Sequence, residues 1–162
     1  MKYTFQLTRR LAADLVRLPE PHVDRLDDFI ELYEQFGLSD HTKYPGRLSP
    51  SWHRLPTNHA NCVHATKYSL WHYHMGHPHY AGGSSNADGS KWGQTSQYLI
   101  HFRWVGGGAH IDIVDLYTHD NSSGQFYIPS LKTIDPQQET ENSPPDTQIV
   151  KGEAPANKNA AG

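Results

Sequence analysis

The chain has 162 residues, which is enough for one domain with a hydrophobic core and too few for two. Its one cysteine, Cys62, excludes an internal disulfide and a cysteine-based zinc site. The net charge of −3 is spread unevenly, since residues 14–40 are acidic and their neighbouring segments are mildly basic, which is only a weak indication of a polyanionic ligand.

The first forty residues predict one strand followed by two helices. Residues 2–8 alternate apolar and polar side chains, as a half-buried strand does. Thr8 can cap a helix over 9–18, and a longer helix over about 21–36 carries one apolar stripe and ends at Gly37. Because the sequence alternates from its start and contains no long apolar run, we expect no signal peptide, no membrane span and a cytoplasmic location.

The rest of the chain predicts strands and connections. A loop is expected over 38–60, because this segment contains three prolines and no sustained period. Alternating segments predict strands at about 62–75, 97–105 and 110–118. Further expectations are a flexible connection at 82–90, a tight hairpin turn at 105–109 and a short closing strand at 126–131.

Residues 135–162 are polar, rich in proline and free of aromatic side chains, so we expect a disordered tail after a domain over 1–134. The predicted order of elements is β-α-α-β-β-β, which indicates an α+β fold. The two helices would form a helical hairpin packed on one face of an antiparallel sheet. The other face of the sheet would then be left for solvent or a ligand.

Histidines gather on the predicted strands. The stretch YSLWHYHMGHPHY at 68–80 contains four of them: His72, His74, His77 and His79. Alternation places His72 and His74 on one face of their strand, and His101 and Arg103 on one face of the next strand. If the registers agree, these four side chains converge on the exposed sheet face, where histidine can exchange protons and arginine can bind phosphate. For each histidine alone, an ordinary polar position on a half-exposed strand is an equally good interpretation.

This order of elements resembles the RelE/ParE superfamily of bacterial toxins. Within this superfamily the chain most resembles the YafO type. The resemblance covers about residues 1–131 and is carried by YPGRLSPSW (44–52), LWHYHMGHP (70–78), SQYLIHFRW (96–104) and HIDIVDLYTH (110–119). It implies a RelE-like fold with a curved antiparallel sheet. It also implies a toxin of a type II toxin-antitoxin system that inhibits growth by cleaving mRNA on the ribosome. The implied partners are mRNA, the ribosome and a cognate antitoxin, with no cofactor and no metal.

Such an endoribonuclease lets the 2′-hydroxyl of one nucleotide attack the next phosphate, so its site needs a base, a cation and an acid. The resemblance implies a catalytic residue near the end of the last strand, where this chain has His119. We expect His119 as acid or base, His72 or His74 as its counterpart, and Arg103 as the cation. The catalytic candidates are His119, His72, His74, Arg103, His101 and Tyr117. Candidates for RNA contacts, which can equally be ordinary surface residues, are Lys67, Arg47, Arg54 and His77.

Two other functions stay open. A gyrase-inhibiting toxin of the ParE type would act by binding alone and would need no cluster of histidines. A histidine-rich metal-dependent hydrolase would use His72 and His74 as metal ligands, and Asp112, Asp115 or His110 could complete the set.

Overall fold

The computed structural model describes residues 1–53, 55–120 and 129 of the chain. Its helices are α1 (Arg9–Asp14), α2 (Glu20–Phe36), α3 (Ala60–Lys67) and two short 3-10 helices, η1 (Leu15–Arg17) and η2 (His41–Lys43). Its strands are β1 (Thr4–Leu7), β2 (Leu48–Pro50), β3 (Leu70–His74), β4 (Ser84–Ser85), β5 (Lys91–Trp92), β6 (Tyr98–Arg103) and β7 (His110–Thr118). No described helix is both long enough and apolar enough to cross a membrane.

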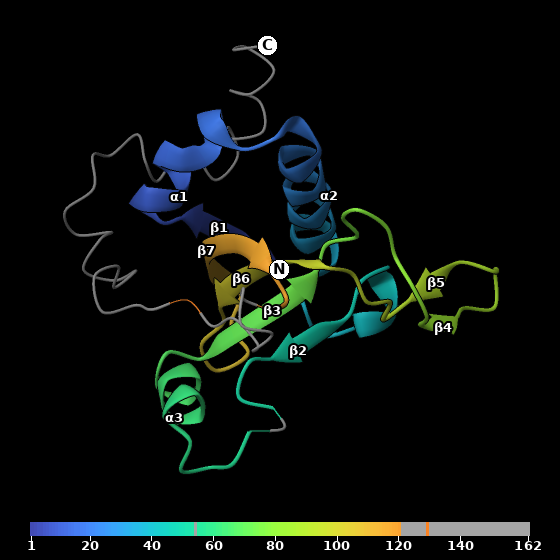
Figure 1. Ribbon diagram of the computed structural model, residues 1–162. Helices are drawn as coiled ribbons and strands as arrows, with labels where there is room; N and C mark the ends of the chain where they lie inside the picture. The colour runs from blue at the N-terminus through green and yellow to red at the C-terminus, as the bar shows by residue number, and fades with distance from the viewer. Residues whose placement is uncertain (54, 121–128, 130–162) are drawn as a thin grey trace.

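Five strands form one sheet in the order β1-β7-β6-β3-β2, with β6 in the middle. β1 runs parallel to β7, and the other neighbouring pairs are antiparallel. In Figure 1, α1 and α2 lie together beside this sheet, and the small β4–β5 hairpin projects away from it. The fold is therefore of the α+β class with a mostly antiparallel sheet, as the sequence predicted.

The first three elements form where the sequence predicted them, and their ends are capped as expected. The Thr8 hydroxyl accepts a hydrogen bond from the backbone N–H of Leu11, at 3.3 Å, which caps α1. Gly37 ends α2 with a φ of 65°, a left-handed conformation that glycine adopts without strain. The predicted helix over 9–18 is divided into α1 and η1, which end before the first proline.

The hydrophobic core lies between the first two helices and one face of the sheet. The ring of Phe29 on α2 stacks on Tyr73 of β3, with 4.8 Å between centroids, and lies 5.5 Å from Phe102 of β6. Further buried members of this core are Phe5, Leu7, Leu11, Leu26, Ile30, Tyr33, Ile100, Ile111 and Ile113. Because successive side chains of a strand point to opposite faces, His72 and His101 face away from these helices.

Two predictions between residues 38 and 75 were wrong. The predicted strand over 62–75 begins only at Leu70, and its first half is the helix α3, which the ring of His59 caps by accepting the Asn61 N–H at 3.0 Å. The predicted loop over 38–60 contains β2, an edge strand that includes Pro50. An edge strand tolerates proline because it needs ladder hydrogen bonds on one side only.

The remaining connections agree in part with the sequence. The turn predicted at 105–109 joins β6 to β7, with Gly106 and Gly107 at φ of 62° and 69°. The connection predicted at 82–90 contains β4 and leads into β5, with Ser84 opposite Trp92. The closing strand predicted at 126–131 and the tail at 135–162 lie outside the described residues, apart from residue 129.

Candidate active site

Four histidines lie side by side on the sheet face that α1 and α2 leave uncovered. The register pairs His72 with His101, and their ring centroids are 6.1 Å apart. The backbone N–H of His119, just after β7, donates to Gln97 O at 2.6 Å. This bond holds the His119 ring 5.5 Å from His74 and 6.4 Å from His72. We call His72, His74, His101 and His119 the histidine cluster.

Three members of the cluster are buried, so the expectation of an exposed face was wrong for them. The exposed fractions of His72, His74 and His101 are 5%, 2% and 0%. Burial lowers the pKa of His101 to about 3 and that of His74 to about 4, and holds the pKa of His72 well below its usual 6.5. These three rings are therefore neutral at pH 7. Alternation had indicated the face on which they lie, but it carries no information about what covers that face.

Serine residues from two connections orient the buried rings. Ser51 is itself buried, and its hydroxyl lies 3.0 Å from His72 Nδ1. The backbone N–H and the carbonyl oxygen of Ser96 each lie 3.0 Å from His74 Nδ1, and the tautomer of the ring decides which of them bonds. Neither serine was predicted as a site residue, because each meets its histidine only through long-range folding.

His119 differs from the rest of the cluster in its exposure and its partner. Its side chain is 38% exposed, and its Nδ1 lies 2.9 Å from a carboxylate oxygen of Asp120. A carboxylate only accepts hydrogen bonds, so this nitrogen carries a proton. The position of Asp120 directly after His119 was a signal that the sequence analysis did not use.

Arg47 reaches the cluster because Gly46 lets the chain pass directly against β3. A Cβ atom at Gly46 would lie 1.7 Å from the carbonyl oxygen of His74, so only glycine fits there. The backbone N–H of His74 donates to Arg47 O at 3.0 Å, and that of Arg47 donates to Gln94 O at 2.8 Å. The Nε of Arg47 is buried and makes no hydrogen bond to the part of the chain that the structure describes.

Arg103 does not occupy the place that the sequence analysis gave it. The register pairs it with Leu70, two positions from the paired histidines, and its Nε donates to Tyr68 O at 3.1 Å. His119 lies at the other end of β6, beside Gln97. Arg103 therefore does not join His72, His74 and His101 as predicted, because a shared face does not ensure a shared position along the strand. The arginine that lies in one cavity with His72 and His119 is Arg47.

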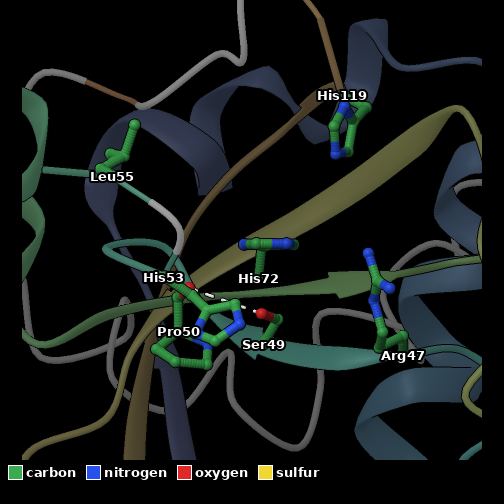
Figure 2. Close-up of a pocket in the computed structure, with 7 residues that line it drawn as sticks. All are labelled: Arg47, Ser49, Pro50, His53, Leu55, His72 and His119. Carbon is green, nitrogen blue, oxygen red and sulfur yellow. Dashed lines mark hydrogen bonds between the residues drawn. The ribbon is translucent and has the colours of Figure 1, made fainter.

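A cavity of about 370 Å³ lies beside His72 and His119, and this volume is typical of ligand sites. It is lined by Arg47, Ser49, Pro50, His53, Leu55, His72 and His119. Figure 2 shows His72 in the middle, with Arg47 and His119 on one side and Pro50 and Leu55 on the other. A neutral imidazole, an exposed imidazole and a guanidinium thus share one cavity, and together they can transfer protons and bind an anion.

Among the described residues, three further candidates do not line this cavity: Tyr117, Lys67 and His77. Tyr117, on β7, is 44% exposed. Lys67 ends α3 and places its Nζ 5.2 Å from the centre of a neighbouring tyrosine ring. The ring of His77 lies 4.4 Å from His22 of α2, and so on the helix side of the sheet. Arg54 lies outside the described residues.

The candidate metal ligands do not form one metal site in the part of the chain that the structure describes. His110 Nε2 lies 3.0 Å from a carboxylate oxygen of Asp112 near the start of β7, whereas Asp115 accepts the backbone N–H of Leu116 at 2.9 Å. Among residues 1–53, 55–120 and 129, no three His, Cys, Asp or Glu side chains are placed to hold one metal ion. The ligand set expected for a metal-dependent hydrolase is thus not assembled in the part of the chain that is described.

A comparison of the chain with known protein families, curated proteins and solved structures finds no match.

Proposed function

We propose that the chain is a RelE-like endoribonuclease toxin that cleaves RNA without a metal ion. The observation that carries the proposal is that Arg47, His72 and His119 line one cavity. These side chains match the three needs of the reaction, which are a base, a cation and an acid.

His72 has the properties of the base. Burial keeps its pKa well below 6.5, so the ring is neutral at pH 7 and has the free lone pair that a general base needs. When its Nδ1–H is donated to the Ser51 hydroxyl, Nε2 carries the lone pair that accepts the proton of the 2′-hydroxyl. The 2′-oxygen then forms a bond to phosphorus.

His119 has the properties of the acid. It is the most exposed member of the cluster, and its Nδ1 lies 2.9 Å from a carboxylate oxygen of Asp120. As the bond between phosphorus and the 5′-oxygen breaks, His119 donates a proton to that oxygen. The products are a 2′,3′-cyclic phosphate and a free 5′-hydroxyl. No electron transfer and no cofactor is required.

Arg47 stabilises the charge of the phosphorane. A guanidinium donates to two phosphate oxygens at once, and the buried Nε is a donor that a phosphate can satisfy. His74 and His101 pack behind the reacting groups, and as neutral rings they add no competing positive charge. The substrate of the proposed reaction is mRNA on the ribosome, and a cognate antitoxin would neutralise the toxin in the cytoplasm.

The test is induced expression in a bacterium, with new mRNA 5′ ends mapped and examined for a 5′-hydroxyl. We expect growth arrest and new 5′-hydroxyl ends with the wild type. The His119→Ala variant should produce neither, because the leaving oxygen loses its acid, a loss of about 100- to 10,000-fold in rate. The matched control is His79→Ala, which removes an exposed histidine outside the cavity and should behave as the wild type.

The outcomes separate the possible functions. Equal cleavage by wild type and His119→Ala would contradict the assignment of the acid. Growth arrest without new RNA ends would favour a binding toxin of the gyrase-inhibiting type. Cleavage in a purified system that stops with a chelator and returns with zinc would favour the metal-dependent hydrolase.

A further inference from the structure

The proposed reaction uses only part of the cavity lining. Arg47 and His119 lie on one side of His72, and only this side is used by the reacting phosphate (Figure 2). The other side is formed by Pro50, His53 and Leu55, with Ser49 between the two sides, and the proposed reaction gives none of these four a role.

The chemistry of this second side is that of a site for a flat aromatic ring. Pro50 and Leu55 are half-buried apolar side chains, and His53 is an exposed ring that can stack on another. The hydroxyl of Ser49 makes one long hydrogen bond, 3.5 Å, to Pro50 O. A hydrogen bond of that length is weak, so the hydroxyl can donate to or accept from a ligand at little cost.

The two sides are also spaced for parts of one ligand. Arg47 and Ser49 are two positions apart on the chain that enters β2, and alternation in an extended chain places such side chains on the same face, about 6 to 7 Å apart. One nucleotide can bridge this span, with its phosphate at Arg47 and its base beyond Ser49.

We propose that Ser49, Pro50, His53 and Leu55 form a subsite for the nucleobase next to the cleaved phosphate, and that this subsite sets the base preference of the enzyme. The inference rests on the proposed function for the identity of the substrate. It assigns the stacking contacts to Pro50, His53 and Leu55, and the hydrogen bond to the edge of the base to Ser49.

The test measures binding rather than cleavage. The wild-type protein is titrated with the four nucleoside 5′-monophosphates and, as a ligand without a base, with ribose 5-phosphate. We expect at least one nucleotide to bind roughly 10-fold more tightly than ribose 5-phosphate, which is typical of a stacked base. Leu55→Ala and Ser49→Ala should remove most of this difference, whereas Arg47→Ala should weaken the binding of all five ligands. Val63→Ala, an exposed apolar position on α3, is the matched control and should leave every affinity unchanged.

Each outcome bears on one proposal or the other. If all four nucleotides bind with the same affinity as ribose 5-phosphate, the proposed base subsite is wrong. The proposed roles of Arg47, His72 and His119 are not affected by that result. If a base-dependent affinity is found but expression yields no RNA ends, the subsite stands and the nuclease is wrong. If none of the ligands binds, the subsite is wrong as well.

Discussion

At the scale of single residues, Arg47 combines a buried donor with a position beside two histidines. Its guanidinium lies in the same cavity as His72 and His119, and its buried Nε makes no hydrogen bond to the described residues. This arrangement is costly for a cation unless an anion joins it, because buried donors normally have partners. In the proposed reaction, the phosphate supplies the acceptor for this donor.

Replacing Arg47 tests this explanation. We expect Arg47→Ala to lower the cleavage rate about 100- to 1,000-fold, since a donor to the developing negative charge is lost. Arg47→Lys keeps the charge but loses the planar fork, so it should recover only part of the rate. Rates on a defined RNA, with the thermal midpoint measured in parallel, check the prediction. A rate for Arg47→Ala within two-fold of the wild type would contradict it.

Gly46 makes a second prediction at this scale. In Gly46→Ala the new methyl group meets the carbonyl oxygen of His74, so the chain must move away from β3 and take Arg47 with it. We expect a loss of about 2 kcal/mol or more in the free energy of unfolding, and a lower cleavage rate. Gly108→Ala is the matched control, because the nearest atom to its Cβ, Val105 O, lies at 3.4 Å. Denaturant unfolding of both variants checks the prediction, and equal midpoints would contradict it.

At the scale of elements, the segment between β3 and β6 braces the site. The backbone N–H of Gln94 donates to Pro45 O at 2.9 Å, and its carbonyl accepts from Arg47 N–H. The same segment supplies Ser96, which holds His74. This connection therefore positions the cation and one histidine of the cluster from outside the main sheet.

Two variants of Gln94 separate its backbone from its side chain. Gln94→Pro removes the N–H that bonds Pro45, which loosens the segment before Arg47. A displacement of about 1 Å can cost up to about 100-fold in rate, and we expect a loss that approaches this. Gln94→Ala keeps the backbone bonds and loses only the side-chain contact of 3.2 Å to the same oxygen, so its rate should stay close to that of the wild type. Equal rates for the two variants would show that the brace is unimportant.

Sequence patterns predicted the elements whose periodicity is strong and local. The strand at Thr4–Leu7, the helix at Glu20–Phe36 and the strand at His110–Thr118 each have an apolar pattern that matches one face of the core. The helix at Ala60–Lys67 was missed because its short segment, ANCVHATK, carries no clear helical stripe. The edge strand at Leu48–Pro50 was missed because proline in a loop-like segment hides a strand of three residues.

The candidate site was predicted in part for the same reason. Alternation placed His72, His74 and His101 on one face, and this is a local property of a strand. Whether Arg47 or Arg103 lies beside the histidines depends on the strand register and on the close approach of a loop to β3. A local sequence pattern predicts neither. The burial of the histidines likewise depends on the whole fold.

At the scale of the whole molecule, the buried cluster links stability to pH. Below the usual pKa of 6.5 the unfolded chain protonates its histidines, while the folded chain keeps His74 and His101 neutral down to about pH 4 and 3. The unfolded state then binds more protons than the folded state. The free energy of unfolding is therefore highest above pH 6.5 and falls as the pH decreases. Arg47 and His119 face the same rings, and their charge opposes protonation of the folded form.

We therefore expect the free energy of unfolding, measured with urea, to be constant between pH 7 and 8 and to fall between pH 6.5 and 5. Each buried histidine contributes up to about 1.4 kcal/mol per pH unit to the slope of this free energy against pH. His101→Leu removes one such group, so its slope should be smaller by that amount, whatever the substitution does to stability at pH 7. His79→Leu, at an exposed position, is the matched control and should keep the wild-type slope. The slope is the decisive quantity, because a change in packing shifts the whole stability curve, whereas only the loss of a buried titrating group flattens it.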